Sequence, residues 1–394
     1  MAKVYDIQVL NQISQVGLRQ LPAERYRVSK DGSKPDAILL RSHVMHGMTV
    51  PDSVQAVGRA GAGTNNIPVK ELSGRGVPVF NAPGANANAV KELVLAGILM
   101  AARNLAPAMR FVDGLSGAPE VLQKKIEDGK KQFAGIELPN HTLGVIGLGK
   151  IGSLVADAAI KLGMNVLGYD PEITVDAAWS LPSQVRKAHS IDEILKASHF
   201  VTLHVPLLDV TRNLINARNL EHMRSGAIVL NFSREEIVDA SAVIAALAGH
   251  RMKYYVTDFP ATGLIGTQGV IALPHLGAST REAEDNSAVM VVEQVRDYLE
   301  HGNVQNAVNF PDVVMQREAP YRLGIANANV PNMVGQISSA VARSGLNIHS
   351  MMNRSKRDMA YTLVDIDSPA TDSLVGELSA IKGVLAVRYL PLND

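Results

Sequence analysis

The sequence predicts an α/β protein with a doubly wound parallel sheet in a central domain, a smaller α/β domain divided around it, and a C-terminal α+β domain. Three observations support this prediction. Residues 143–170 combine a strand pattern, a glycine-rich turn, a helical pattern and a second strand pattern. Short apolar runs alternate with helical patterns on both sides of that stretch, as in a parallel sheet. Residues 320–394 then begin a new series in βαββαβ order, which is typical of ferredoxin-like domains.

The central stretch reads LGVIGLGKIGSLVADAAIKLGMNVLGYD. An apolar run leads into Gly147, Gly149 and Gly152, which have GxGxxG spacing. Gly147 permits a tight turn, Gly149 lets a pyrophosphate approach the backbone, and Gly152 lets the helix pack close to the strand. The free N–H groups and the positive end of the helix dipole then favour phosphates. The alternative is a glycine turn with a purely structural role.

Asp170 stands at the end of the second strand pattern, 18 residues after Gly152. A carboxylate there accepts hydrogen bonds from a ribose diol and repels a 2′-phosphate. The stretch therefore predicts an NAD site rather than an NADP site. Because Asp170 precedes Pro171, the alternative is that it only forms a turn.

Composition excludes several classes of function. The chain has 394 residues, 38 Lys and Arg against 38 Asp and Glu, and no cysteine. The charge balance argues against a nucleic-acid partner. The lack of cysteine excludes disulfides, thiolate catalysis and cysteine-bound metals, and fits the cytoplasm. No apolar run is long enough to span a membrane, and no signal peptide is evident at the start. We expect no bound metal.

Residues 1–92 predict an α/β unit with strands at 37–40, 54–57 and 77–80. Arg41 follows the first of these, and the segment from Arg59 to Gly63 follows the second. Ligands of open α/β sheets gather at the carboxyl ends of strands, where arginines and glycine N–H groups suit an anion. The alternative is a solvated arginine beside a tight loop.

Beyond Asp170, strand and helix patterns continue to alternate until residue 273. Four polar residues follow the strand patterns, and parallel strands would bring them to one edge of the sheet. They are Asp170, Arg234, Asp258 and His275. A long helix over 281–301 then returns to the first domain, and the asparagines and Pro311 of 303–314 suggest a linker. The turn-rich segment 81–88 suggests a hinge.

Oxidation of an alcohol with NAD needs a base that takes the hydroxyl proton, and histidine suits neutral pH. For a 2-hydroxy acid, an arginine must also hold the carboxylate. Arg234 and His275 supply this pair. The alternatives are a surface ion pair for Arg234 and a capping role for His275 in its Pro-His-Leu-Gly turn.

The chain resembles the D-isomer-specific 2-hydroxyacid dehydrogenases that carry a C-terminal ACT domain. The resemblance rests on VGRAGAGTNNI, LGVIGLGKIG, HVPLLDVTRNLI, NFSREEIVD, PHLGAST, NANVPNMVGQIS and SGLNI, and it covers essentially the whole chain. It implies a flavodoxin-like substrate domain (1–92 and 283–308), a Rossmann NAD domain (93–282), a linker (309–319) and an ACT-like regulatory domain (320–394). It also implies oxidation of 3-phosphoglycerate at C2, feedback by L-serine, and a homodimer or homotetramer.

The resemblance also assigns roles to single residues. Arg234 would bind the substrate carboxylate, and His275 would be the acid–base. The implied cofactor contacts are Gly147, Gly149, Lys150, Ile151, Gly152, Asp170, Pro206, Thr211, Ser233, Asp258 and Gly277. The implied substrate contacts are Arg41, Arg59, Gly61, Ala62, Gly63, Lys91 and Arg234.

Two departures from the family pattern concern the catalytic residues. Arg234 is followed by Glu235 where the family has glycine. The family also places a glutamate a few residues after the aspartate that matches Asp258, and it pairs with the catalytic histidine and raises its pKa. The segment Thr257–Gly263 contains no glutamate. Asp258 is therefore either a nicotinamide contact or the partner of His275.

Asn327, Asn329 and Asn347 form a candidate effector site in the C-terminal domain. Asparagine offers a donor and an acceptor, which suits the ammonium and carboxylate of serine. The βαββαβ order suggests that Asn329 and Asn347 face the same end of the module, and its open edge suggests pairing with a second copy. The alternative is that these asparagines only shape turns. Asn327 also stands where the family often has histidine.

Two other functions remain open from the sequence alone. One is a related dehydrogenase acting on glyoxylate, lactate or phosphoerythronate, against which the ACT-like tail argues. The other is an NAD-sensing binding protein that keeps the fold without catalysis, for which the missing glutamate is the support.

Overall fold

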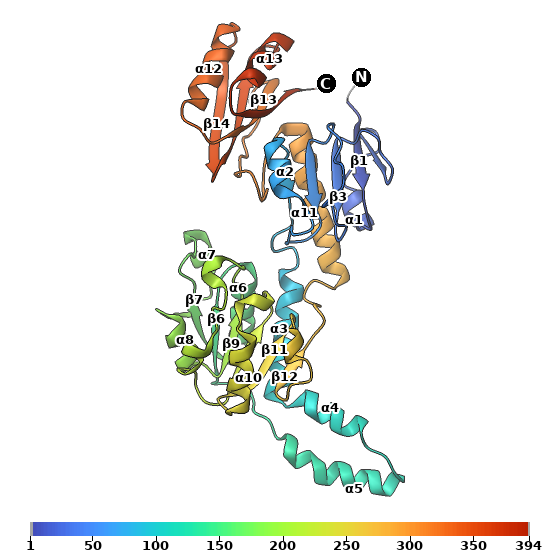
Figure 1. Cartoon of the computed structure of the whole chain (residues 1–394), viewed down its shortest axis with the longest axis vertical. Helices are drawn as coiled ribbons and strands as arrows, with labels where there is room; N and C mark the ends of the chain where they lie inside the picture. Colours follow the sequence, from blue (N-terminus) through green and yellow to red (C-terminus); the bar gives the residue numbers. More distant parts are fainter. Residues whose placement is uncertain (1–2, 393–394) are drawn as a thin grey trace. The chain divides into compact units, whose positions relative to one another are not determined.

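The computed structural model of the chain describes residues 3–392, apart from the side chain of residue 176. The chain forms two compact units (Figure 1), and each is considered separately. One unit comprises residues 1–86 and 281–394, and the other comprises residues 87–280. No helix in the described part of the chain is both long and apolar enough to cross a membrane.

The second unit is built on a seven-stranded sheet in the order β12-β11-β10-β9-β6-β7-β8, with every pairing parallel. Its strands are β6 (Thr142–Ile146), β7 (Asn165–Tyr169), β8 (Arg186–Lys187), β9 (Phe200–Leu203), β10 (Ala227–Asn231), β11 (Met252–Thr257) and β12 (Val270–Ala272). Its helices are α3 (Ala87–Ala102), α6 (Lys150–Lys161), α7 (Val175–Trp179), α8 (Ile191–Ala197), α9 (Ala217–Leu220) and α10 (Ala240–Ala248).

Two apolar clusters cover the two faces of this sheet. One contains residues of α3 and α6, and the other contains residues of α8 and α10. The central strands β9 and β10 are buried along their whole length, which explains their continuous apolar sequences. This architecture confirms the predicted doubly wound parallel sheet.

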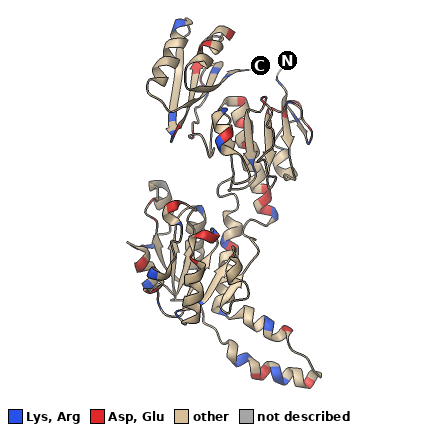
Figure 2. Ribbon diagram, in the orientation of Figure 1, with Lys and Arg blue, Asp and Glu red and all other residues tan. Residues whose placement is uncertain are grey.

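A helical arm, residues 105–133, extends from the second unit (Figure 1). It consists of α4 (Leu105–Asp113), α5 (Pro119–Gly129) and a short 3₁₀ helix, and neither α4 nor α5 has a buried residue. Charges of both signs alternate along α5 (Figure 2). The rings of Phe111 and Phe133 pack with centroids 5.3 Å apart and hold the base of the arm together.

The first unit contains a five-stranded parallel sheet in the order β2-β1-β3-β4-β5, which is the flavodoxin-like order. Its strands are β1 (Tyr5–Val9), β2 (Tyr26–Ser29), β3 (Ala37–Leu40), β4 (Ala56–Arg59) and β5 (Val79–Phe80). The helices are α1 (Gln15–Leu18), α2 (Val69–Gly74) and α11 (Arg281–His301). Residues Val291 and Val295 of α11 belong to the core of this domain, so α11 contributes to its packing.

The segment 303–314 is packed rather than a loose linker, and the interpretation of its asparagines was wrong. Val304 pairs with Val313, and Phe310 is fully buried in the core of the first domain. Asn309 accepts a hydrogen bond from the Val79 N–H at 2.9 Å and donates to the Val77 carbonyl at 2.9 Å. Asn309 therefore satisfies backbone groups next to β5, and Asn303 accepts the Met315 N–H at 3.2 Å.

The C-terminal domain has the predicted βαββαβ order and an antiparallel sheet ordered β14-β15-β13-β16. Its elements are β13 (Tyr321–Ala328), α12 (Met333–Arg343), β14 (Ile348–Lys356), β15 (Met359–Ile366), α13 (Asp372–Ala380) and β16 (Val384–Pro391). The two helices share an apolar cluster with one sheet face. The other face packs on the first domain, where Tyr361 donates a hydrogen bond to the Gly302 carbonyl at 2.9 Å.

The expected placement of the effector asparagines at one end of the module was wrong. β13 and β14 both pair antiparallel with β15, so they run in the same direction. Tyr321 and Ile348, which begin these strands, share the partner Ile366. Asn347 therefore lies at the end where β13 begins, whereas Asn329 lies beyond its opposite end. A single copy cannot bring the two side chains together.

A buried ion pair joins the C-terminal sheet to the segment that precedes it. Arg322 on β13 and Asp365 on β15 are both fully buried. The guanidinium donates to both carboxylate oxygens and to the carbonyls of His301 and Gln316, at 2.5 to 3.1 Å. Asp365 also accepts the N–H of Glu318 at 3.1 Å. This network fixes the end of α11 and residues 316–318 against the sheet.

We expect Asp365→Asn to destabilise the C-terminal domain by about 3–5 kcal/mol, because it leaves a buried guanidinium without its counter-charge. The double variant Arg322→Met/Asp365→Leu should recover much of this loss, since apolar pairs of similar volume often replace buried ion pairs at little cost. Urea unfolding of the three proteins measures both effects. Wild-type stability of the single variant would contradict the account.

Candidate functional site

The carboxyl ends of the parallel strands in the second unit form one edge, and the predicted polar residues lie along it. Asp170 follows β7, Arg234 follows β10, Asp258 follows β11 and His275 follows β12. Because all pairings in this sheet are parallel, these strand ends share an edge, as the sequence predicted. The strand order reverses at the β6–β9 pair, and the glycine turn follows β6 at this point.

The glycine turn has the geometry that a dinucleotide pyrophosphate requires. Gly147 has a φ of +91°, and a Cβ there would lie 2.5 Å from the His204 carbonyl oxygen. A Cβ on Gly152 would lie 2.0 Å from the Gly147 carbonyl oxygen, so only glycine lets α6 begin this close to β6. Gly149, by contrast, faces open space, and no side chain caps α6. The residues present therefore fit the phosphates of a dinucleotide.

The Asp170 carboxylate ties the glycine turn to the end of β7. One oxygen accepts the Leu148 N–H at 2.8 Å, and the other accepts the Glu172 N–H at 3.0 Å. The hydrogen bond from Glu172 closes a turn, so Asp170 does have the turn-forming role that the sequence offered as the alternative. The hydrogen bond from Leu148 places the carboxylate beside the glycine turn, where a ribose would lie if its pyrophosphate bound at α6.

The loop after β9 lies at the same strand edge as the glycine turn. The Thr211 hydroxyl donates to the Pro206 carbonyl at 2.6 Å and accepts the Leu208 N–H at 2.8 Å, which closes this loop. The Ser233 hydroxyl donates to the Leu203 carbonyl at 2.7 Å and joins the ends of β9 and β10. Burial lowers the pKa of His204 to about 3, so the His204 ring itself is neutral at neutral pH. No role for His204 was predicted from the sequence.

Asp258 holds the loop that carries His275. Its side chain is 1% exposed, and its two oxygens accept the N–H groups of Leu276 and Gly277 at 2.7 Å each. The His275 N–H also donates to the Asp258 carbonyl at 3.1 Å. Burial raises the pKa of the Asp258 carboxyl, while the two N–H donors and His275 oppose that rise. Asp258 therefore binds the backbone of the loop that carries His275.

Phe259 lies between the two predicted catalytic side chains. Its ring centroid is 4.5 Å from that of His275 and 5.6 Å from the Arg234 guanidinium carbon. Arg234 also donates to the Ser233 carbonyl at 2.6 Å, which directs the guanidinium along this edge. No role for Phe259 was predicted from the sequence, because contacts between residues from three loops leave no spacing signal. Contact with Phe259 brings Arg234 and His275 to one place.

The predicted anion-binding residues of the first unit lie at the carboxyl ends of β3 and β4. The Arg59 Nε donates to the Arg41 carbonyl at 3.1 Å, so the two residues are neighbours. Arg41 forms an ion pair with Glu284 of α11 at 2.7 Å, and Gly61 lies against the Arg59 guanidinium. Lys91 lies on α3 of the second unit, where its Nζ donates to Asn88 at 2.6 Å.

No cluster of three or more His, Cys, Asp or Glu side chains within the described part of the chain has the geometry of a metal site. The effector candidates have structural partners. Asn327 is 1% exposed and donates to the Ala328 carbonyl at 2.7 Å, and Asn329 donates to the Arg357 carbonyl at 3.0 Å. The Asn347 N–H donates to Asp367 at 3.3 Å.

Known proteins match this chain over most of its length. Residues 95–277 match the D-isomer specific 2-hydroxyacid dehydrogenase, NAD binding domain, family. D-3-phosphoglycerate dehydrogenase of Methanocaldococcus jannaschii is 34% identical over 305 residues, which are 75% of this chain and 55% of that protein. The chain thus spans about half the length of that relative. The enzyme of the same name from Haemophilus influenzae is 31% identical over 85% of this chain and 81% of its own length.

A solved structure shows the same fold. The NAD⁺-bound 3-phosphoglycerate dehydrogenase of Entamoeba histolytica aligns with a TM-score of 0.59 and 23% identity, over 77% of this chain and 98% of that chain. The glycine turn, the shared strand edge and these matches agree with one another. The chain therefore belongs to the D-isomer-specific 2-hydroxyacid dehydrogenase family.

Proposed function

We propose that the protein oxidises D-3-phosphoglycerate to 3-phosphohydroxypyruvate with NAD, the first step of serine biosynthesis. The observation that carries the proposal is the contact of Phe259 with both Arg234 and His275 at the strand edge that also holds the glycine turn. The names of the relatives support the choice of substrate. The cysteine-free chain fits a cytoplasmic enzyme.

His275 acts as the base. Its ring takes the proton of the C2 hydroxyl while the C2 hydride leaves, and the exposed position of the ring lets it pass the proton to water. The nicotinamide, when bound, supplies the hydride acceptor. Arg234 holds the substrate carboxylate through two N–H groups, which fixes C2 relative to His275. Phe259 limits the motion of both side chains.

Because the family's glutamate is missing from this segment, different groups surround the His275 ring. In the family pattern a carboxylate pairs with the imidazole, whereas here Phe259 contacts the ring and Asp258 holds the backbone of the loop. This difference is also the one feature that favours a non-catalytic NAD-binding protein. NADH formation on mixing the protein with NAD and 3-phosphoglycerate decides between the two.

The remaining predicted residues are proposed as binding contacts. Gly149, Lys150 and Ile151 offer backbone N–H groups to the pyrophosphate, Asp170 binds the ribose, and the loop closed by Thr211 lines the cofactor. For the substrate phosphate and carboxylate, the proposed contacts are Arg41, Arg59, Gly61, Ala62, Gly63 and Lys91.

We propose that serine binds the C-terminal domain only when two copies pair. β14 is an edge strand, and antiparallel pairing with a second β14 would place Asn347 of one copy beside the Lys356 end of the other. Asn329 already contacts that end through the Arg357 carbonyl. The pairing would therefore unite the two asparagines that a single copy keeps apart.

The arm formed by α4 and α5 is proposed as a second contact between copies, giving a homodimer or homotetramer. Leu105, Met109 and Val112 are 42%, 62% and 53% exposed and follow helical spacing along α4. Val121 and Ile126 on α5 are also exposed. A helix pair without a buried residue gains little from its own packing, so a partner surface must stabilise it.

For cofactor choice, we expect kcat/KM with NADP to be far below that with NAD. Asp170→Asn removes the charge that repels a 2′-phosphate but keeps oxygen and donor groups at the turn. In this variant the ratio of kcat/KM with NAD to kcat/KM with NADP should fall about tenfold, which corresponds to about 1.4 kcal/mol. Glu172→Gln, which alters a neighbouring charge, serves as the control. A ratio unchanged by Asp170→Asn would contradict the assignment.

For catalysis, His275→Ala should lower kcat about 10²–10⁴-fold, the range for a positioned acid–base. Arg234→Ala should abolish nearly all turnover, and Arg234→Lys should recover little because lysine lacks the two-pronged contact. Steady-state NADH formation measures these effects, with His222→Ala on the surface as a control. The mechanism is wrong if His275→Ala keeps wild-type activity.

For regulation, Asn329→Ala and Asn347→Ala should each abolish serine binding in calorimetric titrations. When the two variants are unfolded and refolded together, the mixed dimers contain one intact site built from the two unaltered asparagines. Serine binding should therefore reappear in the mixture. A mixture that remains unable to bind serine, although wild type binds it, would rule out the composite site.

For assembly, the double variant Met109→Lys/Val112→Lys should reduce the molar mass in sedimentation experiments, because it places charges on the apolar side of the arm. Lys124→Glu and Lys125→Glu on α5 control for charge alone. An unchanged molar mass would show that the arm is not an interface.

A further inference from the structure

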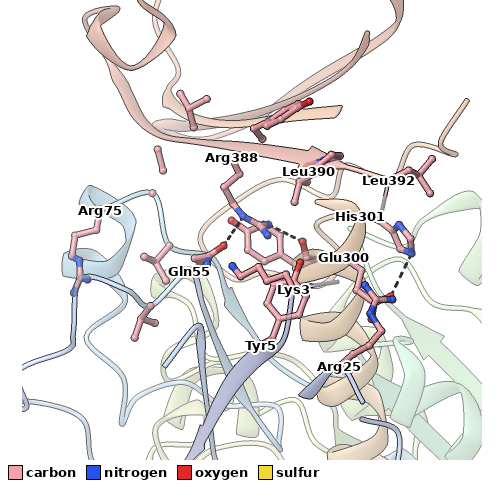
Figure 3. A pocket seen from close by; sticks show the side chains of 18 of the residues that line it. Lys3, Tyr5, Arg25, Gln55, Arg75, Glu300, His301, Arg388, Leu390 and Leu392 are labelled. Atoms are coloured by element: carbon pink, nitrogen blue, oxygen red, sulfur yellow. Dashed lines mark hydrogen bonds and ion pairs between the residues drawn. The ribbon is translucent and has the colours of Figure 1, made fainter. Parts of the chain in front are cut away.

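A cavity of about 520 Å³ lies between the C-terminal domain and the first domain. Both belong to one compact unit. Strand β16 borders it on one side, and residues around β1, β4 and α2 border it on the other (Figure 3). Its charged side chains are five Lys or Arg and two Asp or Glu. They are Lys3, Arg25, Arg75, Arg317, Arg388, Asp52 and Glu300.

Two of these guanidinium groups are bound only by neutral acceptors. Arg388 donates to the Gln55 side chain at 2.8 Å and to two backbone carbonyls of α11, and it lies 4.3 Å from the Tyr298 ring centroid. Arg317 donates to the carbonyls of Ala319, Pro320 and Leu390. Within residues 3–392, neither has a carboxylate at ion-pair distance. Burial and the charge of Arg322 lower the pKa of Arg317.

The acidic residues do not balance this charge. Glu300 is shared between Arg25 at 3.3 Å, His301 at 3.8 Å and the Tyr26 hydroxyl at 2.5 Å. Asp52 is fully exposed and 3.6 Å from Arg75. The Arg25 Nε is buried and has no hydrogen-bond partner among the described residues. The lining thus carries a net charge of 5 − 2 = +3 with histidine neutral, and Asp36, which lies outside the lining, pairs with Lys3 at 2.9 Å.

The cavity is separate from the proposed substrate contacts of the same domain. Lys3 precedes β1, Gln55 precedes β4 and Val77 precedes β5, so the cavity lies at the amino ends of the parallel strands. Arg41 and Arg59 lie at the carboxyl ends. The arginines that line the cavity and the proposed substrate arginines therefore lie at opposite edges of one sheet.

We propose that this cavity binds a small multivalent oxyanion, a phosphate or a polycarboxylate, that bridges the C-terminal domain and the first domain. Its volume falls in the range of small-molecule sites, and guanidinium forks suit both kinds of oxyanion. Arg317 and Arg388 approach from the C-terminal side, and Lys3, Arg25 and Arg75 approach from the first domain. The bound anion offsets their repulsion and favours the docked arrangement of the two domains.

Calorimetric titration of the full-length protein with inorganic phosphate, and separately with citrate, tests the proposal at constant ionic strength. Lys3→Gln and Arg75→Gln should each weaken binding about 5-fold, as expected for loss of about 1 kcal/mol from one charge near 4 Å in water. Asp52→Asn should strengthen it, because it removes an opposing charge from an exposed side chain. Lys34→Gln lies on the same domain outside the cavity and should change nothing.

Phosphate bound at the substrate contacts would persist in all these variants, so only the change between variants reports on the cavity. Weaker binding of either anion by Lys3→Gln and Arg75→Gln, with Lys34→Gln unchanged, supports the site, and the anion that shows this change identifies the ligand class. The proposal is overturned if neither anion binds, or if Lys3→Gln, Arg75→Gln and Asp52→Asn all bind as wild type does. Equal weakening by Lys34→Gln would also overturn it, since that result indicates only general charge attraction.

Discussion

The carboxylate of Asp258 is the interaction on which the candidate active site depends. It is buried at the end of β11 and accepts two backbone N–H groups from the loop after β12. His275 in that loop has a φ of +57°, a left-handed conformation that costs a residue with a side chain roughly 1–3 kcal/mol. The two charge-assisted hydrogen bonds stabilise this conformation. Without them, the imidazole would lose its fixed place beside Phe259.

The parallel sheet supplies the second constraint. Its carboxyl ends collect side chains that are far apart in sequence, so the glycine turn, Arg234, Asp258 and His275 meet along one edge. The family pattern adds a glutamate that pairs with the histidine, and this chain has none in the matching segment. Here an aromatic ring lies between the arginine and the histidine. The site therefore keeps its positions through packing and backbone hydrogen bonds rather than through a carboxylate–imidazole pair.

The sequence allowed prediction of features whose cause is local. The predicted helix 281–301 matches α11 to the residue, and the glycine turn has the predicted geometry. Short strands were harder to predict, since β4 and β5 each begin two residues later than expected. Pairing with neighbouring strands sets those limits, and it does not show in a single strand's pattern.

Features that depend on contacts between distant segments were missed or misread. The contacts of Phe259 join three loops, and the asparagines of 303–314 resembled a linker although Asn309 binds the backbone of β5. β13 and β14 run in the same direction, so Asn329, which follows β13, and Asn347, which precedes β14, lie at opposite ends of the sheet. A regulatory site built from both requires a second copy, which a single sequence does not display.

The most direct test of the central claim uses D-3-phosphoglycerate carrying deuterium at C2. If His275 and Arg234 support hydride transfer, the protein forms NADH with the deuterium on the nicotinamide ring, and a primary isotope effect appears when hydride transfer limits the rate. The same mechanism predicts that His275→Ala binds NAD normally but transfers the label far more slowly. Tight binding of NAD by the wild-type protein without any transfer of deuterium would contradict the account and indicate a binding protein with a dehydrogenase fold.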